Sequence, residues 1–94
     1  MAIHEDPEQN EDRALARLIP SFAGLHVVEI GAGDGRITRK YAHAAKSVIA
    51  VDPNAGEIAV LRAALPAIDA RAIGIGDLRM PAHSVDVVLF SWSL

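Results

Sequence analysis

Three glycines placed directly after a short apolar run limit, more than any other feature, what this chain can fold into. The run covers residues 26–30, and the stretch that begins at Glu29 reads EIGAGDG, with glycine at positions 31, 33 and 35. Glycine has no Cβ, so the chain can turn sharply there and a ligand can approach the backbone closely. A helical pattern follows over residues 35–44. The glycines therefore predict a strand, a tight turn and a helix whose N-terminus favours anionic or carboxylate-bearing ligand groups.

The rest of the chain repeats this alternation of strand and helix. Nearly continuous apolar runs predict further strands over 47–51 and 85–90, as in strands that are covered on both faces, and a less apolar segment predicts a strand over 70–75. A helix opens at Asn54 and ends at Pro66, before the third strand. This order predicts an α/β protein with a parallel sheet.

Composition narrows the class of protein further. The chain has 94 residues, enough for one domain, and a net charge of −3 with no cysteine. No basic patch offers itself to nucleic acid, and the missing thiols exclude disulfides, thiolate catalysis and cysteine-bound zinc. The N-terminus, which precedes a helix predicted over 6–19, does not resemble a signal peptide, and no apolar run is long enough to span a membrane. We therefore expect a soluble, cytoplasmic protein that associates with neither membrane nor nucleic acid.

An acidic residue, Asp52, follows the second predicted strand. In nucleotide-binding α/β folds, a carboxylate at this place can accept hydrogen bonds from both hydroxyls of a ribose. Dinucleotide-binding proteins carry the pattern G-x-G-x-x-G, which here would need glycine at position 36, whereas the chain has Arg36 and places its third glycine at Gly35. This spacing counts against NAD. An NAD(P)-binding oxidoreductase domain is kept as an alternative because Asp52 would serve either ligand.

Taken together, these segments resemble class I S-adenosylmethionine-dependent methyltransferases. The residues around EIGAGDG resemble the first motif of that family, and Asp52 matches its acidic residue after the second strand. The segment 76–81 resembles its adenine-side motif, and residues 84–94 resemble its fourth-strand motif. The resemblance implies a Rossmann-like three-layer sandwich and the cofactor S-adenosyl-L-methionine.

The resemblance also implies a role for each matching residue. The glycine loop would cradle the methionine end of the cofactor, with the Glu29 carboxylate near its amino group. Asp52 would hold the ribose, Asp77 would accept a hydrogen bond from the adenine amino group, and Ser91 would stand near the methyl group. The cofactor-binding residues expected in this way are Glu29, Gly31, Ala32, Gly33, Gly35, Asp52, Pro53, Asp77, Leu78 and Ser91.

The chemistry expected of this family requires little catalytic machinery. The methyl group of a sulfonium is already activated, so the protein mainly has to align donor and acceptor. The four histidines are far apart and none repeats at metal-ligand spacing. We therefore predict no metal site and name no catalytic base. No Asn/Asp-Pro-Pro-aromatic tetrad follows the fourth strand, which favours a small-molecule acceptor over nucleic acid.

The chain matches only part of the family's seven-stranded sheet. It would supply strands 3-2-1-4 of that fold, as a single truncated methyltransferase domain with an N-terminal helix in 1–22 and a cofactor-binding half in 23–94. The strand over 85–90 would then become an apolar edge, which invites self-association. The favoured interpretation is part of a longer enzyme. The alternatives are a chain that pairs through this edge, and a non-catalytic cofactor-binding or interaction module.

Overall fold

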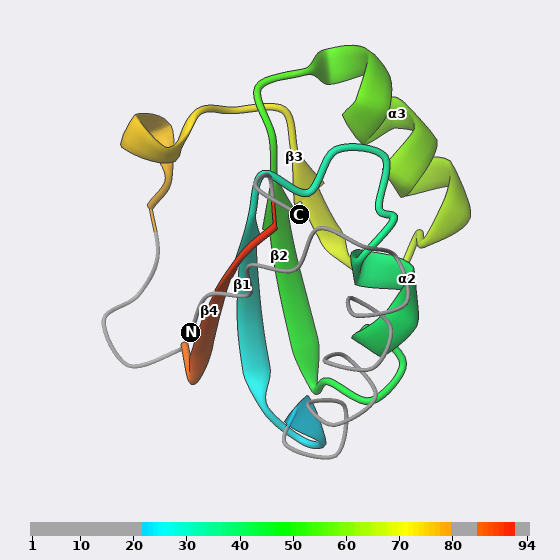
Figure 1. Ribbon diagram of the computed structural model, residues 1–94, viewed down its shortest axis with the longest axis vertical. Coiled ribbons are helices and arrows are strands. Elements are labelled where there is room, and N and C mark those ends of the chain that lie inside the picture. Colours follow the sequence, from blue (N-terminus) through cyan, green and yellow to red (C-terminus); the bar gives the residue numbers. More distant parts are fainter. Residues whose placement is uncertain (1–21, 80–84, 92–94) are drawn as a thin grey trace.

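The computed structural model describes residues 22–79 and 85–91 (Figure 1). Strands and helices alternate, in the order β1 (His26–Ile30), α2 (Thr38–Tyr41), β2 (Ser47–Val51), α3 (Ala55–Ala64), β3 (Asp69–Arg71), the short 3-10 helix η1 (Ile75–Asp77) and β4 (Val87–Phe90). The N-terminal helix predicted over 6–19 lies outside the described residues.

The four described strands form one parallel sheet in the order β3-β2-β1-β4, which confirms the predicted fold class. β1 lies between β2 and β4, where Ile30 pairs with Val51 on one side and with Phe90 on the other. After β3 the chain crosses to the far side of β1, so the strand order reverses next to β1. Ligands of open α/β sheets bind beyond the carboxyl ends of the strands at such a reversal.

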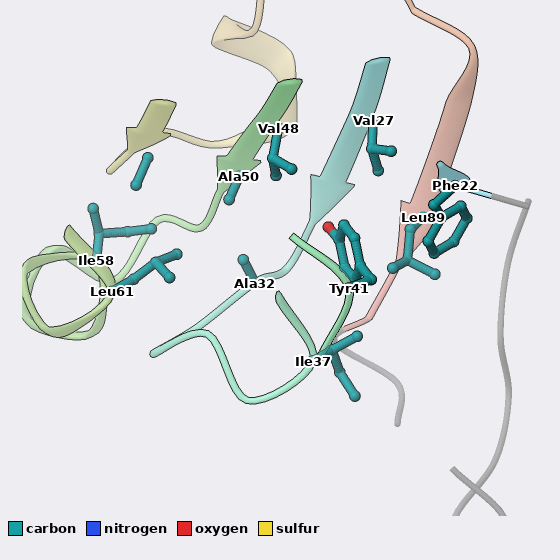
Figure 2. Packing of buried hydrophobic residues seen from close by; sticks show 11 residues of the cluster. Phe22, Val27, Ala32, Ile37, Tyr41, Val48, Ala50, Ile58, Leu61 and Leu89 are labelled. Carbon is teal, nitrogen blue, oxygen red and sulfur yellow. The ribbon is translucent and has the colours of Figure 1, made fainter. Parts of the chain in front are cut away.

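One face of the sheet packs against both helices and forms the larger part of the core. Figure 2 shows side chains of β1, β2 and β4 directed toward those of α2 and α3. Tyr41 of α2 and the pair Ile58 and Leu61 of α3 are fully buried there. The ring of Tyr41 meets that of Phe22 edge to face, with the ring centroids 5.0 Å apart. The helices therefore fix the position of the loops that join them to the strands.

The opposite face of the sheet is also apolar. Val28, Ile30 and Val51 are buried on this face, with partly buried hydrophobic side chains packed around them. Because both faces are apolar, the strands read as continuous hydrophobic runs rather than as an alternation.

The helix after the glycines is much shorter than the predicted 35–44, since α2 covers only Thr38–Tyr41. Gly35 has a φ of 94°, in the left-handed region, so the right-handed helix cannot include it. At the other end Ala44 N bonds to Tyr41 O, a contact from i to i−3 that closes a turn and does not extend the helix. The seven residues after β1 are thus used for the loop.

The other helix begins as predicted. The side chain of Asn54 accepts a hydrogen bond from Glu57 N at 3.0 Å, so it caps α3 and satisfies one of the free backbone donors of the first turn. The buried stripe is Ile58 and Leu61, and Leu65 is only partly buried against the same cluster.

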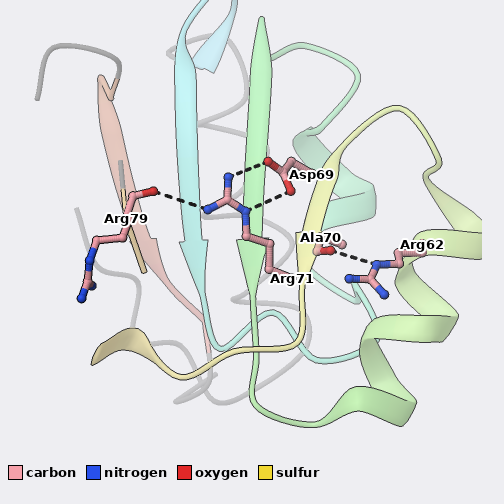
Figure 3. A network of polar contacts seen from close by, with 5 residues as sticks. All are labelled: Arg62, Asp69, Ala70, Arg71 and Arg79. Carbon is pink, nitrogen blue, oxygen red and sulfur yellow. Dashed lines mark hydrogen bonds and ion pairs between the residues drawn. The ribbon is translucent and has the colours of Figure 1, made fainter. Parts of the chain in front are cut away.

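Polar side chains surround β3 at one edge of the sheet (Figure 3). Arg71 pairs with Asp69 at 2.7 Å and also donates to the carbonyl of Arg79. Arg62 of α3 donates to the carbonyl of Ala70 at 2.9 Å and ties the helix to this strand. The strand is three residues long, shorter than the predicted 70–75, and such a short charged edge resists pairing with other chains.

β4 forms the other edge of the described sheet and begins two residues later than predicted. Its side chains are more covered than an exposed edge would suggest, because Leu89 is fully buried and Val87 and Phe90 are partly buried. The carboxylate of Asp86 accepts from His26 N at 2.8 Å and Asp86 N donates back to His26 O, so this residue joins β4 to β1.

The described helices are short, α3 being the longest with ten residues. None of them has the length and hydropathy that a crossing of the bilayer requires.

Candidate functional site

The glycine loop is fastened to the end of the neighbouring strand. Gly31 N and Ala32 N both donate to Val51 O, at 2.9 and 3.0 Å. Gly31 and Gly33 have φ values of 78° and 57°, a region that side chains rarely allow, so glycine is required for this path. Figure 1 shows the loop lying beside the carboxyl end of β2. Two strand ends thus form one side of a single site.

Asp52 holds the segments that follow β1 and β2 together. Its Oδ2 accepts from Gly33 N at 3.0 Å, and its Oδ1 accepts from Asn54 N at 2.9 Å. A carboxylate has about four lone-pair positions, so each oxygen keeps capacity for one more donor. Asp52 is therefore fixed by backbone amides and can still accept hydrogen bonds from a ligand.

Two cavities of opposite character meet at Asp52 and Gly31. The first, of about 340 Å³, is mainly apolar, and its lining is Ile30, Gly31, Val51, Asp52, Pro53, Ile73, Gly74 and Ile75. The second, of about 300 Å³, is mainly polar, and its lining is Gly31, Ala32, Gly33, Asp34, Arg36, Ile37, Asp52, Glu57 and Ser91. An elongated ligand with an apolar aromatic end and a charged end would suit this pair of cavities.

A buried carboxylate lies behind the polar cavity. Glu29 is fully buried, and its Oε1 accepts from Thr38 Oγ1 at 2.7 Å and from the Tyr41 hydroxyl at 2.6 Å. Its Oε2 accepts from Ser91 Oγ at 2.6 Å. Ser91 lines the polar cavity, so Glu29 acts on that cavity through Ser91 and does not line it.

Burial dominates the titration of this group. Desolvation raises the pKa of Glu29 above its usual value, although the hydroxyls of Ser91, Tyr41 and Thr38 and the charge of Arg36 act in the opposite direction. Burial and the neighbouring carboxylate also raise the pKa of Tyr41. Tyr41 therefore keeps its proton at neutral pH and remains a donor to Glu29.

Replacement of Glu29 by glutamine is expected to change how stability depends on pH. Because the pKa of Glu29 in the folded chain lies above its usual 4.5, the folded state binds the proton more tightly. The contribution of this tighter proton binding to the free energy of unfolding is complete below pH 4.5 and is lost as the pH rises through the folded pKa of Glu29. In thermal unfolding measured upward from pH 4.5, the Tm of Glu29→Gln relative to that of the wild type should therefore increase as the pH rises through the folded pKa of Glu29. A constant difference in Tm across this range would contradict the assignment.

The structure brings six of the ten predicted site residues into the walls of the two cavities. These are Gly31, Ala32, Gly33, Asp52, Pro53 and Ser91. Glu29 lies behind Ser91. Gly35 is buried, and its Cα faces Leu61 of α3 rather than a cavity, so its place is in helix packing. Asp77 is exposed in η1 and Leu78 packs against the second face of the sheet, and neither lines these cavities.

Several lining residues were missed by sequence reasoning. Ile73, Gly74 and Ile75 form a wall of the apolar cavity because the chain leaves the sheet after Arg71, four residues earlier than predicted. The early end of β3 has no clear signal in the sequence. Arg36 and Glu57 line the polar cavity, and their positions directly after the glycines and in the first turn of α3 are signals that could have indicated them.

No group of three acidic or histidine side chains that could hold a metal ion occurs within residues 22–79 and 85–91. Of the four histidines, His26 opens β1, where its Nδ1 contacts Ser47 Oγ at the end of the sheet remote from the cavities.

Comparison with known proteins identifies the family. Residues 27–94 match the family model described as a methyltransferase domain, so the chain belongs to the S-adenosylmethionine-dependent methyltransferases. A probable S-adenosylmethionine-dependent methyltransferase of Mycolicibacterium smegmatis is 37% identical over 73 residues, which are 78% of this chain and 28% of that protein. The chain thus spans about three tenths of the length of the curated relatives it matches.

Solved structures agree with the family and the fold. An S-adenosylmethionine-dependent methyltransferase from Mesorhizobium loti is 30% identical with a TM-score of 0.69, over 83% of this chain and 37% of that one. Phosphoethanolamine N-methyltransferase 1 of Haemonchus contortus is 29% identical with a TM-score of 0.71, over 85% and 18%. Similar structures also include a 23S rRNA methyltransferase and a protein arginine methyltransferase, each 24% identical, which show the fold alone.

Proposed function

We propose that this chain binds S-adenosylmethionine across the carboxyl ends of β1 and β2, and that the protein to which it belongs transfers the methyl group to an acceptor. One observation carries the proposal: an apolar and a polar cavity share Asp52 and Gly31 as common walls. S-adenosylmethionine has an aromatic base, a ribose and a charged amino acid end in that order. The two cavities and the carboxylate between them provide matching surroundings in the same order.

The lining residues suit each part of the cofactor. Pro53 and Ile73 offer apolar walls to the adenine base, and Asp52 keeps acceptor capacity for the ribose hydroxyls. Arg36 supplies the positive charge in the polar cavity, which suits the amino acid carboxylate, while Ser91 and the buried Glu29 behind it suit the ammonium group. The roles implied by resemblance for Asp77 and Leu78 at the adenine remain predictions.

When bound, the cofactor supplies a methyl group already activated by its positive sulfur. The residues of this chain then have to hold the donor in place and exclude water from it. The rigid loop anchored by Val51 O and Asp52 is suited to that task, because its amides are fixed before a ligand arrives. Within the described residues we assign no catalytic base.

We infer that the acceptor is a small molecule. Of the similar structures described above, the one at 29% identity whose acceptor is named acts on phosphoethanolamine, whereas the RNA and protein methyltransferases are 24% identical and bear on the fold alone. The net charge of −3 also opposes binding to a polyanion. Because relatives are about three times as long, the surface that selects the acceptor is not assigned to these 94 residues.

Isothermal titration with S-adenosylhomocysteine and with NAD tests the proposal. The 94-residue chain should bind S-adenosylhomocysteine measurably and NAD at least about tenfold more weakly, a difference of roughly 1.4 kcal/mol. The reason is that the polar cavity suits a charged amino acid end, and Arg36 stands where the dinucleotide pattern has its third glycine, which allows the helix to pack closely on the strand. Equal or tighter binding of NAD would contradict the proposal and favour the oxidoreductase alternative.

A further inference from the structure

Two hydroxyl groups from the short helix α2 converge on one oxygen of Glu29. Thr38 and Tyr41 are three positions apart, so they lie on the same face of the helix, and both donate to Oε1. Both side chains are fully buried. Because Oε1 accepts hydrogen bonds from α2, Oε2 is directed toward Ser91, which lines the polar cavity.

The direction of these hydrogen bonds determines what Ser91 presents to the cavity. The Ser91 hydroxyl has one proton, and its shortest contact is the 2.6 Å bond to Glu29, against 3.1 Å to Gly31 O and 3.4 Å to Ile30 O. Donation to the carboxylate is favoured because bonds to a charged acceptor are shorter and stronger. The Ser91 oxygen is then left to face the cavity with its lone pairs, which suits an N–H donor.

We propose that Thr38 and Tyr41 are positioning residues for the cofactor's ammonium group. They hold the Glu29 carboxylate so that its charge and the lone pairs of Ser91 Oγ both face the polar cavity. The inference rests on the proposed function, since it assigns the recognition of one end of the proposed cofactor to residues that do not touch it. Neither residue belongs to the glycine loop or lines a cavity described above.

A purely structural role would be different in its consequences. The same hydrogen bonds also join α2 to β1, so their loss could simply loosen the fold. A loosened fold would weaken the binding of every ligand of the site. Loss of the positioning role would weaken the binding only of ligands that carry the ammonium group. A pair of ligands that differ in that group therefore separates the two roles.

The experiment compares S-adenosylhomocysteine with 5′-methylthioadenosine, which keeps the nucleoside and lacks the amino acid end. Tyr41→Phe retains the ring that packs on Phe22, and Thr38→Val retains the shape of threonine, so each removes one hydroxyl donor. By calorimetric titration, each variant should bind S-adenosylhomocysteine roughly tenfold more weakly, about the effect of losing one hydrogen bond to a charged group. The affinity of each variant for 5′-methylthioadenosine should stay unchanged. Thr38→Ser keeps the hydroxyl and should bind S-adenosylhomocysteine as tightly as the wild type.

Two further variants complete the test. Ser47→Ala removes a hydroxyl that contacts His26 at the remote end of the sheet, and it should change neither affinity. In a Glu29→Gln background, Tyr41→Phe should have no additional effect on S-adenosylhomocysteine, because its action passes through Glu29. The positioning role would be overturned if the variants weakened the binding of both ligands equally. It would also be overturned if Tyr41→Phe kept its full effect in the Glu29→Gln background. Failure of the wild type to bind either ligand would instead overturn the proposed function itself.

Discussion

Replacement of Asp52 by alanine is expected to weaken the binding of S-adenosylhomocysteine about ten- to a hundredfold. The carboxylate lies where the two cavities meet, and charge-assisted hydrogen bonds of this kind contribute about 1.5–3 kcal/mol. The substitution also releases Gly33 N and Asn54 N, whose acceptors are the two oxygens of this side chain. The substitution therefore removes the hydrogen bonds of Asp52 to the backbone and to the ligand together.

Asp69→Asn is the matched control for this change in calorimetric titrations. It removes the same charge from the same sheet, at the exposed pair with Arg71, and neither of these two residues lines either cavity. Its affinity for S-adenosylhomocysteine should equal that of the wild type, because an exposed ion pair contributes little. An unchanged dissociation constant for Asp52→Ala, or an equal loss for Asp69→Asn, would show that Asp52 does not bind the ribose.

Replacement of Gly35 by alanine is expected to be the most destabilising single-methyl change in this region. The φ of 94° is unfavourable for any side chain, at a cost of about 1–2 kcal/mol. A Cβ at this position would also overlap Cδ1 of Leu61, whose side chain is fully buried in the core, so that side chain would have to shift. Overpacking of this kind adds about 1–3 kcal/mol. For a small domain this is a large part of the free energy of unfolding.

Gly24→Ala separates the two contributions. Gly24 also has a positive φ, of 73°, but a Cβ there would meet no atom within 4 Å. Urea denaturation should therefore show a loss for Gly35→Ala that exceeds the loss for Gly24→Ala by about 1–3 kcal/mol, the overpacking part alone. Equal losses would mean that the backbone strain accounts for the whole effect and that the packing of α3 against the loop is not tight.

The central part of the fold could be predicted from local pattern. The bounds of β1 and β2 match the apolar runs because both strands are covered on both faces, so seven of their ten side chains are hydrophobic. The start of α3 was predictable because its cap, Asn54, lies three residues before the amide that it binds. These features depend on neighbours in the sequence.

The short strands could not be predicted in the same way. The chain leaves β3 after Arg71 although apolar residues continue to Ile75, and those residues instead line a cavity. Whether an apolar segment stays in a sheet depends on the tertiary surroundings, which a single sequence does not display. The length of α2 was overestimated because the conformation of Gly35 was not known.

The candidate site was predicted where residues follow strand ends directly. Gly31, Gly33 and Asp52 are of this kind, since parallel strands bring their carboxyl ends to one edge. The partners of Glu29 were not predicted, because they lie 9, 12 and 62 residues away along the chain and meet it only in the fold. Gly35 was predicted to contact the cofactor from its place in the motif, whereas its neighbour in the structure is Leu61.

The most direct measurement is an amide ¹H–¹⁵N NMR titration of the chain with S-adenosylhomocysteine. If one molecule of S-adenosylhomocysteine occupies both cavities, the amides of Gly31, Gly33, Asp52 and Gly74 should shift together with one dissociation constant, and Gly24 and Ser47 at the opposite end of β1 and β2 should not. Shifts that are confined to the remote end, or that leave either the glycine loop or Gly74 unaffected at saturation, would contradict a site shared between the two strand ends.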